Sequence, residues 1–372
     1  LEMSTGKRLG YLADANTKFS GGIRDTVNGT TGEWKKSLKR VNGSLHKLSD
    51  ILRHTSRSTR IVNEELADFS VELLEHSSSG GLLPCFAKES SGGYGSSKRK
   101  DGGDGMYIGS KSKGFRKWQA CSNSLEFRAG MYEKYLALDG FPLSKTLLQD
   151  LPRTFGDLEP FNDPKSGIHG KLQNVLHAYS LHDPQVGYVQ GMNLIAGFIL
   201  LCSKEDELSC FWLFARMMQL PKYGLRRFFL PGMPRLLILG YQLEHLLSAN
   251  LPRLNDHFRR LGVNTLQWYT PWALTLFACN MPFSMLEKVW DRFFEDGLAA
   301  LLVTTVGILS CAEQRILLCD HDECLGFLKE SMWTEVVDLS KVFDIADSIK
   351  FAHKDCDRLE MEYFVSNSGK TS

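Results

Sequence analysis

Hydrophobic positions along this 372-residue chain recur at three- and four-residue steps over most of its length, which is the spacing of amphipathic α-helices. Proline, glycine and asparagine separate the segments, and no run alternates with the two-residue period of a strand. The run 192–202 is almost wholly apolar, so we expect it to be buried on all sides. The pattern predicts an all-α fold with helices over residues 172–182, 192–202, 205–218, 236–247, 251–261, 271–277, 282–294, 298–311, 324–328 and 336–346.

The same pattern divides the chain into regions. Residues 1–33 are rich in Gly, Ser, Thr and Asn and are expected to be flexible, whereas residues 34–76 have helical spacing. Residues 77–113 are dense in Gly and Ser, which predicts a flexible linker that cannot form a packed core. We expect the main folded domain over residues 114–352, followed by a helix end and tail over residues 353–372.

The segment 34–76 leaves several interpretations open. Its first helix carries basic side chains, and its apolar pattern lasts only two to three heptads. It could form a coiled-coil pair, a docking helix, a basic helix on a membrane surface, or a helical hairpin packed against the main domain. The basic residues are Lys35, Lys36, Lys39, Arg40 and Lys47.

Composition narrows the function classes. The hydrophobic share of 43% and the charged share of 23% are typical of a soluble globular protein, and a net charge of +1 argues against a dedicated nucleic-acid binder. Nine cysteines without a Cys-x-x-Cys pair indicate reduced thiols in the cytosol. The N-terminus is polar and carries no secretory signal pattern, and the longest apolar runs, 194–202 and 298–311, are shorter than the roughly 18–20 residues of a membrane span.

Hydrolase and metal-site motifs are absent from the sequence. There is no Gly-x-Ser-x-Gly and no His-Glu-x-x-His. His169, His177 and His182 lie close together in the chain, but no carboxylate pair completes a metal site around them. We therefore expect no metal and no cofactor of the chain's own.

Two polar residues stand in positions that core packing does not explain. Arg153 follows Pro152, which should end the preceding helix near Asp150 and leave the guanidinium on a turn. Gln190 lies beside Gly191, and its amide can both donate and accept, as is needed to orient a water molecule. Taken singly, a solvated arginine and a loop glutamine are the plainer interpretations.

Together with their neighbours, these residues resemble the TBC domain, the GTPase-activating module that acts on Rab-type small GTPases. The first motif of that family, an aliphatic residue followed at fixed spacing by Asp and Arg, matches Leu147, Asp150 and Arg153. The second, Tyr-x-Gln-Gly-Met, matches Tyr188 to Met192. The third, a Pro followed by Trp-Asp-x-x-Phe, matches Pro282, Trp290, Asp291 and Phe294.

The resemblance covers about two-thirds of the chain and includes two departures. The family usually has Arg two residues before the Trp of the third motif, where this chain has Lys288. The family's N-terminal Arg-x-x-x-Trp pattern is also loosened, because Arg116 and Trp118 are only two residues apart. The difference at Lys288 bears on local packing or a partner contact, and the loosened entry bears on how the first helices of the domain pack.

The resemblance implies a two-lobed helical domain and a mechanism in which this chain supplies two groups in trans. Arg153 would be an arginine finger, and Gln190 would position the attacking water. The partner would be a Rab-type GTPase in its GTP form, which would carry the GTP and Mg²⁺. The resemblance implies a cytoplasmic protein acting in vesicle trafficking, with membrane contact only peripherally, through the lipidated GTPase.

The remaining motif residues would have supporting roles. Asp150 would hold Arg153, Tyr188 would fix the Gln190 loop, and Asn193 could add a hydrogen bond. We expect Asp291 to make a buried structural hydrogen bond or ion pair rather than to act in catalysis, because a carboxylate on an apolar helix needs a partner. Two alternatives stay open: a catalytically silent TBC-type scaffold, and a helical adaptor that only binds a small GTPase.

Overall fold

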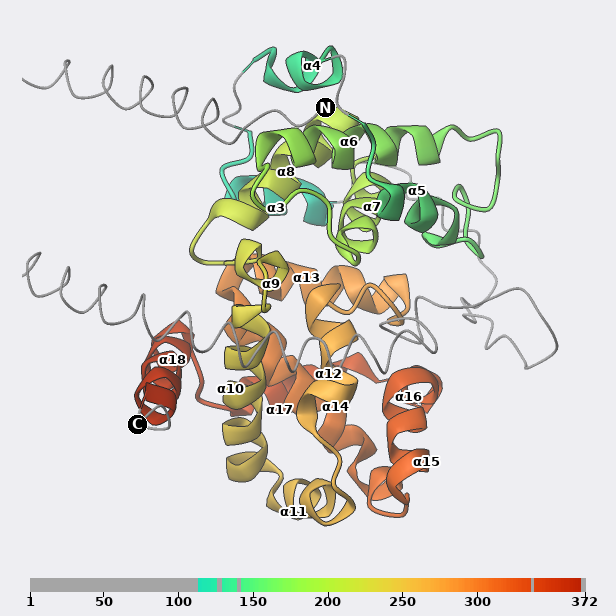
Figure 1. Ribbon diagram of the computed structural model, residues 1–372. Coiled ribbons are helices and arrows are strands. Elements are labelled where there is room, and N and C mark those ends of the chain that lie inside the picture. Colours follow the sequence, from blue (N-terminus) through green and yellow to red (C-terminus); the bar gives the residue numbers. More distant parts are fainter. Residues whose placement is uncertain (1–112, 126–128, 139–141, 336–337, 369–372) are drawn as a thin grey trace, which may run out of the picture. The chain divides into compact units, whose positions relative to one another are not determined.

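The computed structural model describes residues 113–125, 129–138, 142–335 and 338–368, and within these ranges all regular secondary structure is helical (Figure 1). The predicted all-α class is therefore confirmed.

The predicted flexible N-terminus (1–33), the amphipathic segment (34–76) and the linker (77–113, apart from Lys113) lie outside the described residues. Residues 353–368, for which we expected a helix end, form a full helix, α18.

The described helices form two consecutive groups along the chain (Figure 1). The first comprises α3 (Lys113–Cys121), α4 (Met131–Leu136), α5 (Lys145–Asp150), the 3-10 helix η1 (Leu151–Arg153), α6 (Ile168–His182), α7 (Met192–Cys202) and α8 (Glu207–Gln219). The second comprises α9 (Arg226–Phe229), α10 (Pro234–Asn250), α11 (Pro252–Leu261), α12 (Thr265–Leu274), α13 (Phe283–Asp296), α14 (Leu298–Ile316), α15 (His321–Gly326), the π-helix η2 (Phe327–Ser331), α16 (Met332–Glu335), α17 (Leu339–Ser348) and α18 (His353–Ser368).

Local sequence signals set the start of several helices. The side chain of Asp206 accepts a hydrogen bond from the backbone N–H of Ser209 and so caps α8. A reciprocal pair of bonds between Asp320 and Glu323 forms a capping box at α15. Pro252 stands in the first turn of α11, where its missing N–H costs no helical hydrogen bond.

The first group is built around α6, α7 and α8, which pack against one another, while α4 and α5 lie against α6. Helix α7 matches the predicted range 192–202, and nearly all its residues are buried, as expected. Helix α3 packs against α13 of the second group, and its fully buried Trp118 stacks on Phe294 with ring centroids 5.3 Å apart. Aromatic packing therefore ties α3, at the start of the described residues, to α13.

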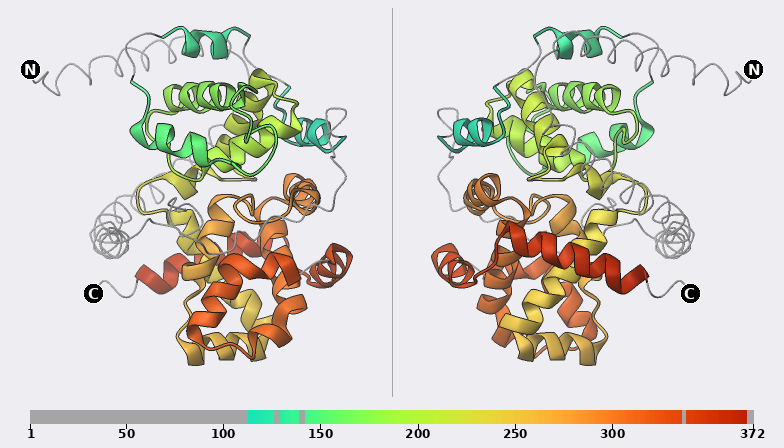
Figure 2. Two further views of the ribbon diagram at one scale, coloured as in Figure 1. Left: turned by 90° about the vertical axis from the view of Figure 1, so that its right-hand side faces the viewer. Right: turned by 90° about the vertical axis from the view of Figure 1, so that its left-hand side faces the viewer.

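The second group surrounds α14, which contacts α10, α13, α17 and α18. Helix α18 lies along the outside of this group, as the right-hand view of Figure 2 shows. At 19 residues, α14 is longer than the expected range 298–311, and by length and composition alone it could span a membrane. Most of it is buried among its neighbours, which is typical of a core helix in a folded protein.

One helix boundary was predicted wrongly. We expected Pro271 to open a helix over 271–277, but it lies inside α12, which begins at Thr265 and ends at Leu274. The start is set six residues earlier by a capping box, in which Asn264 and Gln267 exchange bonds. The chain then turns through Leu276 and Phe277, both with left-handed backbone angles (φ 49° and 67°).

Candidate functional site

Arg153 lies at the end of a short, sharply terminated helix. Helix α5 begins at the Ser144 cap and ends at Asp150, and Pro152 then directs the chain into the 3-10 helix η1, as the sequence predicts. The side chain of Arg153 is 38% exposed, whereas that of Asp150 is fully buried. The arginine can therefore reach the surface while its base is fixed in the fold.

Asp150 is the buried centre of this site. Arg153 donates to Oδ1 of Asp150 through Nε at 2.8 Å and also through Nη2. Tyr188 donates from its hydroxyl to Oδ2 of Asp150 at 2.5 Å. A carboxylate without solvent needs a countercharge and hydrogen bonds, and these two side chains supply both.

Tyr188 stays a neutral donor in this arrangement. Burial raises the pKa of its phenol strongly, the nearby Asp150 carboxylate raises it further, and the Arg153 charge offsets only part of that rise. The hydroxyl therefore keeps its proton near neutral pH and can hold Asp150 continuously.

Gln190 occupies the turn that leads into α7, and its side chain is half-buried. The next residue, Gly191, has a φ of +101°, a conformation that L-residues with side chains rarely adopt. Its N–H donates to Oδ1 of Asn193 at 3.1 Å. The loop that carries Gln190 is therefore held by the first turn of α7.

Thr154 completes the site, although no role was predicted for it from the sequence. It is fully buried, donates from Oγ1 to the carbonyl of Asp150 at 2.8 Å, and accepts from Nδ2 of Asn193 at 2.9 Å. A Cβ on Gly197 of α7 would lie 3.1 Å from side-chain carbons of Thr154 and Phe155, so glycine permits this close approach. Two sequence features could have pointed to this contact: a polar residue directly after Arg153, and a glycine in an apolar helix.

Two bridges of hydrogen bonds therefore connect the Arg153 segment to the Gln190 loop. One runs from Arg153 through Asp150 to Tyr188, and the other from Thr154 through Asn193 to Gly191. Six of the residues singled out from the sequence meet here: Asp150, Arg153, Tyr188, Gln190, Gly191 and Asn193.

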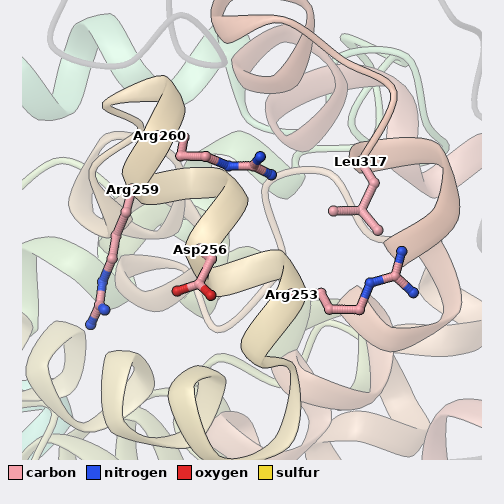
Figure 3. A pocket seen from close by; sticks show the side chains of 5 residues that line it. All are labelled: Arg253, Asp256, Arg259, Arg260 and Leu317. Atoms are coloured by element: carbon pink, nitrogen blue, oxygen red, sulfur yellow. The ribbon is translucent and has the colours of Figure 1, made fainter.

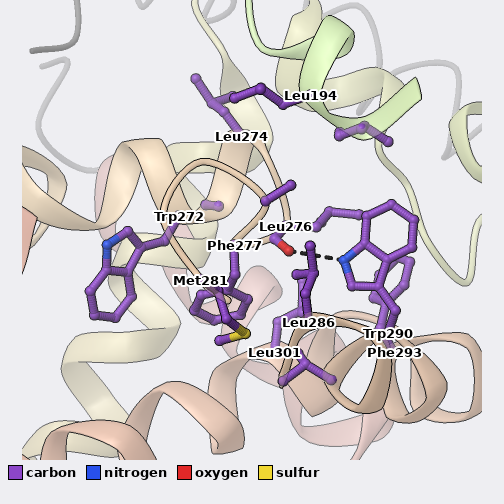
Figure 4. Close-up of a cluster of buried hydrophobic side chains, with 14 of the residues drawn as sticks. Leu194, Trp272, Leu274, Leu276, Phe277, Met281, Leu286, Trp290, Phe293 and Leu301 are labelled. Carbon is purple, nitrogen blue, oxygen red and sulfur yellow. Dashed lines mark hydrogen bonds between the residues drawn. The ribbon is translucent and has the colours of Figure 1, made fainter. Parts of the chain in front are cut away.

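The third motif is not part of this cluster and contributes to packing. Pro282 is the N-cap of α13, and the fully buried Trp290 donates from Nε1 to the carbonyl of Leu276 at 3.0 Å (Figure 4). Asp291 accepts from Nε1 of Trp118 at 2.7 Å. The preferred interpretation of Asp291, a structural hydrogen bond, agrees with this contact.

Across the described residues, no group of three or more His, Cys, Asp or Glu side chains could hold a metal ion.

Comparison with known proteins identifies the family. The model of the Rab-GTPase-TBC domain matches residues 115–317, more than half of the chain and all of the site. The chain belongs to the Rab-GTPase-TBC domain family. The match begins within α3 and ends just after α14, so it includes all three motif segments and the helices that carry them.

Individual relatives agree with this assignment. The chain is 30% identical over 253 residues to the Rab GTPase-activating protein eat-17 of Caenorhabditis elegans, an alignment that covers 68% of this chain and 28% of that protein. It is 35% identical over 218 residues to the GTPase-activating protein GYP5 of Eremothecium gossypii, which covers 58% of this chain and 25% of that protein. The chain thus spans less than a third of the length of these relatives.

Among solved structures, the TBC domain of a Chlamydomonas flagellar RabGAP is similar, with a TM-score of 0.52 and 22% sequence identity. The superposition covers 77% of this chain and 91% of that one. This likeness establishes the TBC fold for the described helices.

Proposed function

We propose that this protein accelerates GTP hydrolysis by a Rab-type small GTPase in its GTP form, with Arg153 as an arginine finger and Gln190 as the group that positions water. The observation that carries the proposal is the pair of hydrogen-bonded bridges that connect the segment of Arg153 to the loop that carries Gln190. The relatives named as Rab GTPase-activating proteins support the choice of partner.

The chemistry needs only these two groups from the chain. In phosphoryl transfer, negative charge spreads over the transferring group, and an arginine supplied in trans lowers the barrier by stabilising it. Such a finger is worth roughly 10³–10⁵ in rate, or about 4–7 kcal/mol. The partner GTPase would supply GTP, Mg²⁺ and the phosphate-binding loop, so this chain would need no cofactor.

Asp150 would act as the positioning residue for Arg153. A guanidinium has five N–H donors, and Asp150 engages those on Nε and Nη2, on one side of the group. The side chain of Arg153 is 38% exposed, so it would reach a phosphate from a base that Asp150 keeps fixed, which lowers the entropy lost on reaching the transition state. Through the lipidated GTPase, the protein would act at the cytoplasmic face of membranes in vesicle trafficking.

Single-turnover hydrolysis by a panel of GTP-loaded Rab proteins, with and without catalytic amounts of the full chain, tests the proposal. Acceleration of one or a few Rabs should fall by about 10³-fold or more in Arg153→Ala. Arg358→Ala, which removes an exposed arginine of α18, is the matched control and should keep full activity. Rab binding without acceleration by the wild-type chain would instead support the scaffold or adaptor alternative.

A further inference from the structure

A second candidate site lies on α11, in the group of helices that does not carry Arg153. A hollow of about 630 Å³ opens between α11 and the residue after α14, lined by Arg253, Asp256, Arg259, Arg260 and Leu317 (Figure 3). In Figure 1, α11 lies at the end of the helical assembly away from α5. The hollow shares no residue with the site of the proposed function.

The arginines of the hollow are not neutralised by the fold. Asp256 lies three residues after Arg253 and four before Arg260, spacings at which helical side chains form ion pairs. Arg358 and Glu362 of α18 do pair at such a spacing, at 2.6 Å. In contrast, neither Arg253 nor Arg260 forms an ion pair with any carboxylate in the described part of the chain.

The carboxylates that follow Leu317 in the chain have other hydrogen-bond partners. Asp320 and Glu323, which follow Leu317 in the chain, accept hydrogen bonds from each other's backbone N–H at the start of α15. Figure 3 shows Arg253 and Arg260 both extending toward Leu317, with Asp256 between their bases. Two guanidinium groups therefore face the same hollow, and neither forms an ion pair with the Asp256 carboxylate that also lines it.

Helix stability does not explain the basic residue at the start of α11. Arg259 and Arg260 stand in the last turn, where a positive charge is favoured by the helix dipole. Arg253 stands in the first turn, directly after Pro252, where a positive charge opposes the same dipole. Arg253 is exposed and forms no ion pair within the described residues, and its charge opposes the helix dipole. A residue placed against its own helix in this way indicates a role in binding.

We propose that this hollow binds a small anion that carries phosphate groups, held between Arg253 and Arg260. The planar fork of a guanidinium matches phosphate oxygens, and two arginines that face one hollow can hold two phosphate groups or two sides of one. The volume of about 630 Å³ falls in the range of small-molecule sites. Leu317 supplies the apolar wall, and the Asp256 carboxylate disfavours weakly held single charges.

Calorimetric titration of the full chain with inorganic pyrophosphate tests this site. One pyrophosphate should bind per chain, and the double variant Arg253→Gln/Arg260→Gln should weaken binding by about tenfold or more. Asp256→Asn should strengthen it by about threefold, because a repulsive charge is removed from the hollow. Lys354→Gln/Arg358→Gln, which removes two exposed charges from α18, is the matched control and should bind as the wild type does.

A second experiment distinguishes a lipid headgroup from a soluble phosphate as the ligand. Flotation with vesicles that contain phosphatidic acid, but not with pure phosphatidylcholine vesicles, would assign the site to a lipid headgroup if the double variant abolishes it. Pyrophosphate binding without flotation would assign it to a soluble phosphate.

Three results would overturn the proposal: no pyrophosphate binding, binding that is equal in the double variant, or a preference for a polyglutamate peptide that depends on the same arginines. Hydrolysis rates of the Rab panel should not change in any of these variants, so failure here and failure of the proposed function are distinguishable.

Discussion

Asp150 is the residue on which both halves of the candidate site depend. It has no exposed surface, and its two oxygens are shared between the guanidinium of Arg153 and the phenol of Tyr188. Its partner Arg153 could be predicted from the three-residue spacing, one helical turn further along the chain. The contact with Tyr188 was not predicted, because it joins positions 38 residues apart and no local pattern links them.

Tyr188→Phe should destabilise the protein and slow the proposed reaction. The change leaves one oxygen of a buried carboxylate without its donor, which costs about 1–2 kcal/mol of unfolding free energy. Arg153 should then be less well positioned, and the single-turnover rate should fall by about tenfold. Urea denaturation and Rab-stimulated hydrolysis measure the two effects.

Tyr241→Phe is the control for this change, because its ring packs on His245 and Tyr363 and no hydrogen bond of its hydroxyl is found among the described residues. It should alter unfolding by less than about 0.5 kcal/mol. Equal effects of the two substitutions would show that the Tyr188–Asp150 bond contributes nothing specific.

Among the helices, α3 and α18 are attached to the second group by a few long-range polar contacts. The sequence predicted most helices to within a few residues, because their apolar periodicity and caps are local. It misplaced the start of α12, where a capping box six residues upstream outweighed Pro271 as the helix signal. The contacts that place α3 and α18 join residues more than a hundred positions apart, so no periodicity could reveal them.

Removing the carboxylate that holds α3 should affect stability and not the proposed reaction. In Asp291→Ala, Nε1 of the buried Trp118 loses its acceptor, and the free energy of unfolding should fall by about 1–3 kcal/mol. Glu295→Ala, on the same helix, removes only an exposed ion pair with Lys117 and should cost less than about 0.5 kcal/mol. A loss of hydrolysis in Asp291→Ala as deep as in Arg153→Ala, at unchanged stability, would refute the structural role.

Helix α18 is held by Glu360, which contacts Arg227 at 2.7 Å and the buried Arg235. Glu360→Gln should lower the free energy of unfolding by about 3 kcal/mol, because Arg235 keeps a buried charge without its countercharge. Glu362→Gln, which breaks only an exposed pair on the same helix, should change it by less than about 0.5 kcal/mol. Similar melting curves for the two variants would contradict this account of the contact.

The same contact predicts an acid-dependent stability. Burial alone would raise the pKa of Glu360, but the bond to Arg227 and the charges of Arg235 and Arg227 outweigh it and lower that pKa. A lowered folded-state pKa gives stability that is present above the ordinary glutamate range, about 4.3, and is lost as the pH falls through the folded value. Thermal melting between pH 7 and pH 3 should show this loss in the wild type and a smaller one in Glu360→Gln.

For the whole molecule, the central claim is that two catalytic groups act in trans from one rigid site. A GTPase commonly orients the attacking water with its own glutamine, so an arginine finger alone would leave that step to the partner. The bridges through Tyr188 and Asn193 connect the loop that carries Gln190 to the segment of Arg153. Under this account, the partner's glutamine is dispensable.

The most direct test is single-turnover hydrolysis by a responsive Rab whose own water-orienting glutamine has been replaced by alanine. The account predicts that the full chain still accelerates this Rab, and that Gln190→Ala and Arg153→Ala each abolish the acceleration. If the wild-type chain accelerates the unmodified Rab but not the variant, the partner supplies the glutamine, and the role proposed for Gln190 is wrong.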